Sequence, residues 1–333
     1  MNTTNQLISD IKEGKIAPIY FLMGEEAYYI DMISDYIEST VLEEGEKGFN
    51  QMVLYGKEVS IQDIVSNSKR YPMMAERQVI IVKEAQNLNK TIEQLVDYAK
   101  NPQPTTVLVF NYKYKTLDKR KSLYKALSKF AVIFESKKVY DDKIPSWIQS
   151  FLRSKQISIT PKAALMLSEF LGNDLSKIAN ELNKLEIVLG AKKEVTPEII
   201  EENIGISKDF NNFELQTALG NLDHKKAYQI VHYFAQNSKQ HPFVLTISTL
   251  YMYFTKLMTV HTVRDKNPST VAKALGINPY FVNEYIAVSR NFPMKRISGV
   301  LETLRTYDTK SKGVGANLSP KDLYNELIYN ILK

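Results

Sequence analysis

Short apolar runs alternate with amphipathic segments over the first 138 residues. Two of these runs, residues 78–83 and 105–111, are almost continuously apolar, as is typical of strands that are covered on both faces. Between the runs, apolar residues such as Ile30, Ile33 and Ile37 recur at helical spacing. The alternation predicts a doubly wound α/β domain with a parallel sheet. The five expected strands are residues 17–23, 49–55, 78–83, 105–111 and 132–135.

Helical spacing replaces the strand pattern from about residue 143 onward. One stripe at this spacing consists of Leu175, Ile178, Leu182, Leu185 and Leu189. Such a stripe is typical of an amphipathic helix that packs in a bundle. The polar segment 205–212 suits a linker between two sets of helices. We therefore expect an α/β domain (1–139), a small helical domain (140–208) and a C-terminal helical domain (209–333).

The strand that ends at Gly24 and leads into a helix has the position of a phosphate-binding loop. Such a loop needs a second glycine, a Lys for the phosphates and a Ser or Thr for Mg²⁺. Here Glu25 and Glu26 follow instead, and carboxylates repel a triphosphate. Lys83 stands where a magnesium-holding Asp would end the strand 78–83, and a cation there cannot bind the metal. We expect a P-loop-type domain with a degenerate nucleotide site, and therefore no ATPase activity and no cofactor.

Composition excludes further classes of chemistry. The chain has no cysteine, so disulfides and thiolate catalysis are absent. Its four histidines lack the spacing of a metal site. The N-terminus has no signal-peptide pattern and no run of 18 apolar residues occurs, so we expect a cytoplasmic protein without a membrane span. The net charge of +6 suits an anionic partner such as nucleic acid, and equally a lysine-rich solvated surface.

Several segments occur in an order and at a spacing that identify a family. They are residues 20–26, 71–78, 172–175 and 180–185, followed by Asp308 and Lys312. This set resembles the delta subunits of bacterial DNA polymerase III clamp loaders over nearly the whole chain. The resemblance implies an AAA+-like domain without a working ATP site, a small helical lid domain and a helical collar domain through which subunits assemble. It also implies a non-catalytic role in DNA replication, within a DNA-directed DNA polymerase holoenzyme.

The resemblance further implies that the chain binds and opens a sliding clamp. Delta subunits grip the clamp with an apolar pair, usually Leu-Phe, which falls here on Met73 and Met74, after Tyr71 and Pro72. Methionine is flexible and fills irregular pockets, so it can serve the same purpose. We expect the pair to project from the end of the helix that begins near Ile61. The implied partners are the sliding clamp (beta), the gamma/tau and delta prime subunits, and primer–template DNA.

Two of these expectations concern DNA. The late loop that carries Lys310 and Lys312 is implied to lie near the template strand, and it has no aromatic side chain for base stacking. The basic, tyrosine-containing stretch 112–124 is either a DNA contact or a solvated surface.

Two alternatives stay open. Residues 271–290 read as a helix, a glycine turn and a second helix, which could make the chain a stand-alone DNA-binding protein. The second of these helices is rich in Tyr, Phe, Val and Ile, which suits packing. The alternative for Met73 and Met74 is that both side chains pack beneath the sheet.

Overall fold

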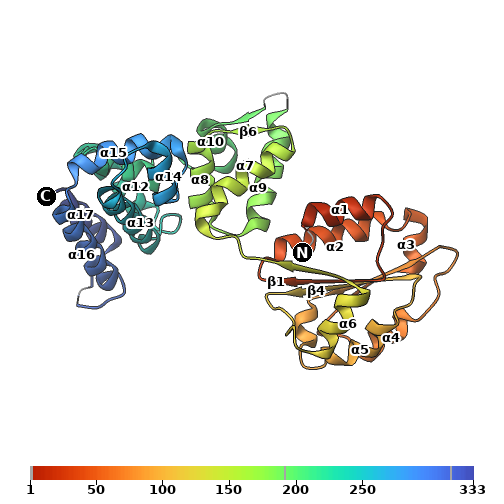
Figure 1. Ribbon diagram of the computed structural model, residues 1–333. Coiled ribbons are helices and arrows are strands. Elements are labelled where there is room, and N and C mark those ends of the chain that lie inside the picture. The colour runs from red at the N-terminus through yellow and green to blue at the C-terminus, as the bar shows by residue number, and fades with distance from the viewer. Residues whose placement is uncertain (1–2, 191–192, 316) are drawn as a thin grey trace. The chain divides into compact units, whose positions relative to one another are not determined.

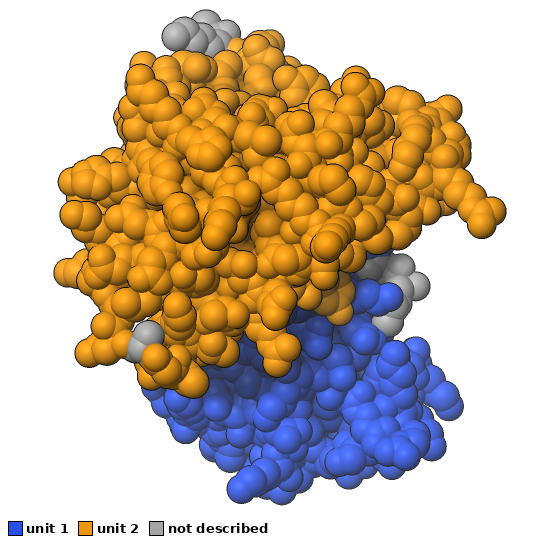
Figure 2. Space-filling model, turned by 90° about the vertical axis from the view of Figure 1, so that its left-hand side faces the viewer, with its two compact units in different colours: residues 1–139 blue, residues 140–333 orange. Residues whose placement is uncertain are grey.

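The computed structural model describes residues 3–190, 193–315 and 317–333. The chain forms two compact units, residues 1–139 and 140–333. Figure 1 shows the α/β and helical parts, and Figure 2 shows the two units in separate colours. A further division of the second unit near residue 208 remains a prediction.

A five-stranded parallel sheet forms the centre of the first unit, in the order β2-β3-β4-β1-β5. The expected parallel α/β sheet is therefore confirmed. In the register of the sheet, Phe21 of β1 lies between Phe110 of β4 and Ile133 of β5. The strands are β1 (Ile19–Gly24), β2 (Gln51–Tyr55), β3 (Gln78–Lys83), β4 (Thr106–Lys113) and β5 (Val132–Ser136).

Helices cover both faces of this sheet, as Figure 1 shows. Alternate residues of β1 point to opposite faces: Phe21 and Met23 join one apolar cluster, and Tyr20 and Leu22 join the other. On one face lie α1 (Thr4–Lys12) and α2 (Ala27–Thr40). On the other lie α4 (Ile61–Ser68), α5 (Val96–Lys100) and α6 (Ser122–Phe130), with the turns η1 (Ala85–Leu88) and η2 (Ile92–Leu95).

The expected strand 49–55 is wrong at its start, because helix α3 (Glu44–Asn50) occupies the residues before β2. A capping box begins this helix: the side chain of Glu43 accepts the backbone N–H of Glu46, and the side chain of Glu46 accepts that of Glu43. The apolar alternation of the following strand happens to extend back to Phe49. The pattern therefore predicted a strand where the helix still continues. Phe49 is consequently an exposed helical residue.

The second unit is helical, with a short two-stranded sheet that the sequence pattern did not predict. Residues 140–208 form a turn, η3 (Asp141–Lys143), the helices α7 (Ile144–Ser154), α8 (Pro161–Leu171), α9 (Leu175–Leu189) and α10 (Pro197–Ile204), and the strands β6 (Ser158–Ile159) and β7 (Glu194–Val195). The expected leucine stripe lies on α9 and is buried.

Residues 209–333 form a second helical cluster. Its elements are α11 (Asn212–Gly220), α12 (His224–Gln236), α13 (Phe243–Thr262), α14 (Pro268–Leu275), η4 (Pro279–Phe281), α15 (Val282–Asn291), α16 (Met294–Ser311) and α17 (Pro320–Leu332). The segment 205–212 that leads into them is held in place: the side chain of Asn211 donates to the carbonyls of Ser207 and Lys208. The ring of Phe210 stacks on Tyr233 at a centroid distance of 5.0 Å.

Helix α13 is the centre of this cluster. By length and composition alone it could span a membrane, which is weak evidence because the core helix of a bundle has the same composition. Here Leu250, Phe254 and Leu257 of α13 are fully buried within the helical cluster. The apolar character of α13 is thus used for packing.

The contact of α11 with α13 and α15 yields a stability prediction. A methyl group at Gly220 would lie 2.5 Å from the hydroxyl of Tyr253 and 2.8 Å from a methyl of Val288. We expect Gly220→Ala to lower the free energy of unfolding by about 1–3 kcal/mol, because the helices must move apart. The matched control is Gly299→Ala on α16, where nothing lies within 4 Å of the added methyl. It should stabilise by about 0.4–1 kcal/mol. Equal effects in chemical denaturation would contradict this account.

Candidate functional site

The connection between α4 and β3, residues 69–77, is an irregular loop with an exposed apolar tip. We call it the methionine loop. Met74 is fully exposed, and Tyr71 and Met73 are 77% and 61% exposed, while Pro72 is partly buried. Helix α4 ends at Ser68, so the two methionines lie in the loop and not at the end of the helix. Their exposure contradicts the alternative in which both pack beneath the sheet.

A buried side chain holds the methionine loop at Met73. Asn50, the last residue of α3, is 4% exposed. Its Oδ1 accepts the N–H of Met73 at 2.6 Å, and its Nδ2 donates to the carbonyl of Met73 at 2.9 Å. The same Nδ2 donates to the carbonyl of Glu46 at 3.1 Å. The next residue, Met74, has a left-handed backbone (φ 53°), which is unfavourable for a residue with a Cβ atom.

The base of the loop is held by a second polar contact. The buried side chain of Gln78, at the start of β3, donates to the carbonyls of Asn67 and Arg70 and to the hydroxyl of Thr106. Thr106 in turn donates to the carbonyl of Ser68 at 2.8 Å. The last carbonyls of a helix lack partners within the helix. Here Gln78 of β3 and Thr106 of β4 donate hydrogen bonds to them. Both ends of the methionine loop are therefore anchored in the first unit.

Sequence reasoning missed two residues of this region. They are Phe49 and Asn50. Phe49 is 76% exposed and directly precedes Asn50, whose side chain holds Met73 through two hydrogen bonds. Both residues were assigned to a strand, in which alternate side chains would have pointed into the core. The capping box at Glu43 and Glu46 is the local signal that could have placed them on a helix.

The turn after β1 is closed by the chain itself. The N–H of Gly24 donates to the carbonyl of Lys115 at 3.0 Å, and the N–H of Glu25 donates to the carbonyl of Ser136 at 3.2 Å. The N–H of Glu26 donates to the hydroxyl of Ser136 at 3.2 Å. A methyl group at Gly24 would lie 2.1 Å from the carbonyl oxygen of Ser136. The N–H groups that a phosphate loop would present thus have partners within the chain.

The carboxylate of Glu26 caps the helix that follows. It accepts the N–H of Tyr28 at 3.4 Å, at the N-terminus of α2. This is where the helix dipole favours negative charge, so a side chain of the protein takes the place that a bound anion would occupy.

Lysines at the carboxyl ends of β3 and β4 pair with carboxylates. Lys113 Nζ lies 2.8 Å from Asp31 and 3.2 Å from Glu84, and Lys83 Nζ lies 3.1 Å from Glu38. Burial alone would lower the pKa of Lys113, but hydrogen bonds and charge from Asp31 and Glu84 outweigh it and raise that pKa. Burial would likewise lower the pKa of Lys83, but hydrogen bonding and charge from Glu38, together with the charge of Asp35, outweigh it and raise that pKa. Both lysines therefore stay charged at this edge of the sheet.

The DNA-proximal candidates also have partners within the chain. Lys310 Nζ lies 3.6 Å from Glu326 and 4.5 Å from the ring centre of Tyr307. Lys312 Nζ lies 2.8 Å from Asp308. The structure places both at the end of α16, and each would have to exchange a carboxylate for a phosphate to bind DNA.

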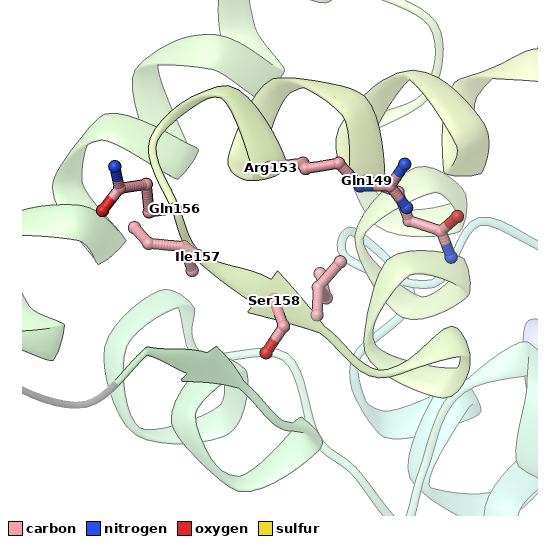
Figure 3. Close-up of a pocket in the computed structure, with 6 residues that line it drawn as sticks. Gln149, Arg153, Gln156, Ile157 and Ser158 are labelled. Carbon is pink, nitrogen blue, oxygen red and sulfur yellow. The ribbon is translucent and has the colours of Figure 1, made fainter.

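The small helical part has a surface pocket of about 380 Å³. Figure 3 shows Gln149 and Arg153 on α7 and Ser158 on β6 among the residues that line it. None of the residues expected to form a site lines it. No group of three or more His, Cys, Asp or Glu side chains that could hold a metal ion occurs in the described parts of the chain.

Comparisons with known proteins agree along the chain. The family model for the DNA polymerase III delta subunit matches residues 20–137, and the model for the C-terminal domain of that subunit matches residues 209–321. The DNA polymerase III subunit delta of Bacillus subtilis is 26% identical over 314 residues, which are 91% of this chain and 90% of that protein. A probable DNA polymerase III subunit delta of Aquifex aeolicus is 22% identical over 304 residues, which are 88% and 82% of the two chains.

A solved structure supports the fold. The Bacillus subtilis DNA clamp loader delta protein superposes with a TM-score of 0.55, at 24% identity and with 99% of each chain covered. This likeness confirms the expected fold, a parallel α/β domain followed by helices. Two family models for successive parts of one subunit, and relatives that span nearly the whole chain, lead to one conclusion: this chain belongs to the DNA polymerase III delta-subunit family.

Proposed function

We propose that this chain is the clamp-loader subunit that binds the sliding clamp during DNA replication and opens it. The observation that carries the proposal is the methionine loop, which presents Met73 and Met74 to solvent from an anchored backbone. Tyr71 and Pro72 belong to the same surface. The similar Bacillus subtilis structure is described as a clamp-loader delta protein, which supports this assignment.

The physical case rests on the exposure of the two methionines. Exposed apolar side chains add little to the stability of the free protein, whereas burying each in an apolar pocket contributes roughly 1.5–3 kcal/mol. Methionine adapts its three side-chain torsions to an irregular pocket. Phe49 is also exposed and directly precedes Asn50, so it is a further candidate for contact with the clamp.

The chain acts without a nucleotide or metal of its own in this proposal. The hydrogen bonds from Gly24, Glu25 and Glu26 to neighbouring segments support this, because these three N–H groups already have partners within the chain. The paired Lys83 and Lys113 oppose magnesium binding at the same edge of the sheet. ATP-driven motion then comes from partner subunits of the gamma/tau type, with delta prime as a further neighbour.

Assembly with those subunits is assigned to the collar, residues 209–333, which follow the lid domain of residues 140–208. Primer–template DNA is the remaining proposed partner, near Lys310 and Lys312. The alternative of a stand-alone DNA-binding protein is not favoured, because the apolar side chains of its helix–turn–helix segment pack together. Val271, Leu275 and Val282 form one buried cluster.

The proposed grip is tested with Met73→Ala/Met74→Ala. Loss of both side chains should weaken binding of the organism's own sliding clamp by roughly two to four orders of magnitude. The melting temperature should not change, because both side chains are exposed in the free protein. Titration calorimetry and thermal melting measure the two quantities on the same preparation.

The matched control is Ile187→Ala/Val188→Ala, which truncates another exposed apolar pair, on α9. It should leave clamp affinity unchanged. Retained affinity in the methionine variant, or an equal loss in the control, would refute the grip.

The isolated chain should not bind ATP, with or without magnesium. The reason is that the turn after β1 and the ends of β3 and β4 already have partners within the chain. Equilibrium dialysis with labelled ATP measures this directly, and micromolar, magnesium-dependent binding would disprove it.

DNA contact should be weak, salt-dependent and independent of sequence. Replacing Lys310 and Lys312 by alanine should reduce the salt dependence of binding by up to about one logarithmic unit per lost phosphate contact. The control removes the same charge at the exposed Lys225 and Lys239. Fluorescence anisotropy with primer–template DNA over a salt series measures the slope, and equal slopes for both variants would remove Lys310 and Lys312 from the DNA surface.

A further inference from the structure

We propose that Asn50 is a positioning residue that holds the methionine loop in the conformation that docks. The inference rests on the proposed function, because it concerns the same surface. It assigns the fixed shape of the loop to one side chain, 23 residues earlier in the chain, on a different element.

The hydrogen bonds of Asn50 make it suited to this purpose. A carboxamide has two donors and two acceptor positions. Here both donors and one acceptor position are used: two bonds go to the backbone of Met73 and one goes to the carbonyl of Glu46. The two bonds to Met73 repeat the paired N–H and C=O contacts of neighbouring antiparallel strands. Asn50 thereby ties the loop to the last turn of α3.

The backbone conformation of the residue after Met73 shows why the loop needs the hydrogen bonds from Asn50. Met74 is in the left-handed region, with φ 53°, and its side chain is fully exposed. A residue with a Cβ atom stays in that region only where its surroundings impose it. The side chain of Met74 packs on nothing in the first unit, so the constraint has to act through the backbone. The residue before it is the one that Asn50 holds.

Holding the loop in advance affects docking. A loop that already has its bound shape loses little conformational freedom on binding. If the competent shape were populated only a tenth of the time, the apparent affinity would fall about ten-fold. Asn50 therefore raises clamp affinity without contacting the clamp, since it is 4% exposed.

The test uses Asn50→Leu, which keeps the branched shape of the side chain and removes its hydrogen bonds, and Asn50→Ala as a second variant. Clamp affinity of the full-length chain should fall about ten-fold in each, which corresponds to about 1.4 kcal/mol. In the background of Met73→Ala/Met74→Ala, the same replacement should change the affinity less than two-fold, because the two side chains that Asn50 positions are gone. A merely structural role would lower affinity equally in both backgrounds.

A second measurement needs no clamp. Hydrogen exchange of the unmodified chain, followed by NMR, should show a protected amide at Met73, although the side chain is exposed. In Asn50→Leu or Asn50→Ala that protection should be lost, whereas the amides of Val79–Val82 in β3 should keep theirs. An unprotected Met73 amide in the unmodified chain overturns the inference, even if both variants fail to fold.

The outcomes separate this inference from the proposed function. If the methionine variant loses affinity and the Asn50 variants keep it, the grip stands and the positioning role is overturned. If the methionine variant keeps its affinity, the proposed function fails and Asn50 has no docking surface to position. Lost protection, a ten-fold loss of affinity and its disappearance in the methionine background together support the inference.

Discussion

Satisfaction of backbone hydrogen bonds at the ends of parallel strands is the constraint on which this structure depends. A parallel sheet leaves the turns at its carboxyl edge with N–H groups that need partners. In a nucleotide-binding protein the phosphates supply them at the turn after the first strand. Here Lys115 and Ser136 do so, from the segments that follow β4 and end β5. The N–H groups of Gly24, Glu25 and Glu26 thereby have partners within the chain.

The charged side chains at the same edge also have partners within the chain. Asp31, Glu38 and Glu84 would repel one another and any phosphate, and the charges of Lys83 and Lys113 offset two of these three negative charges. Partial burial strengthens these pairs relative to surface ion pairs, because less water screens them. The charged groups at this edge of the sheet are therefore paired within the first unit.

The methionine loop combines an exposed surface with a held backbone. Gln78 and Thr106 supply partners to the last carbonyls of α4, and Asn50 holds the tip. Exposed apolar side chains on a mobile loop would collapse onto the protein or lose entropy on binding. Polar side chains buried beneath the loop prevent both. The exposed surface and its support therefore come from different residues: the first is apolar and exposed, the second polar and buried.

Local sequence patterns were sufficient to predict the main strands and helices and the family. Short, nearly continuous apolar runs are typical of strands covered on both faces, and residues 78–83 do form such a strand. The leucine spacing on α9 likewise requires one buried helical face. The glutamates after Gly24 would repel a phosphate, and the cation of Lys83 would repel Mg²⁺. Both charges were the basis for predicting that no phosphate site is present. The strand at residues 78–83 and the helix with the leucine stripe could be predicted because each depends on neighbours in the chain.

Tertiary structure decided which apolar residues are exposed and what holds them. A pair of methionines can lie in a core or on a surface, and only the packed fold shows that Met73 and Met74 face solvent. The pairing of Asn50 with Met73, and of Lys113 with Asp31, joins residues far apart in the chain, which no local pattern encodes. The strand expected at residue 49 failed for a related reason: alternation is a weak signal over a few residues, and a capping box nearby determined a helix instead.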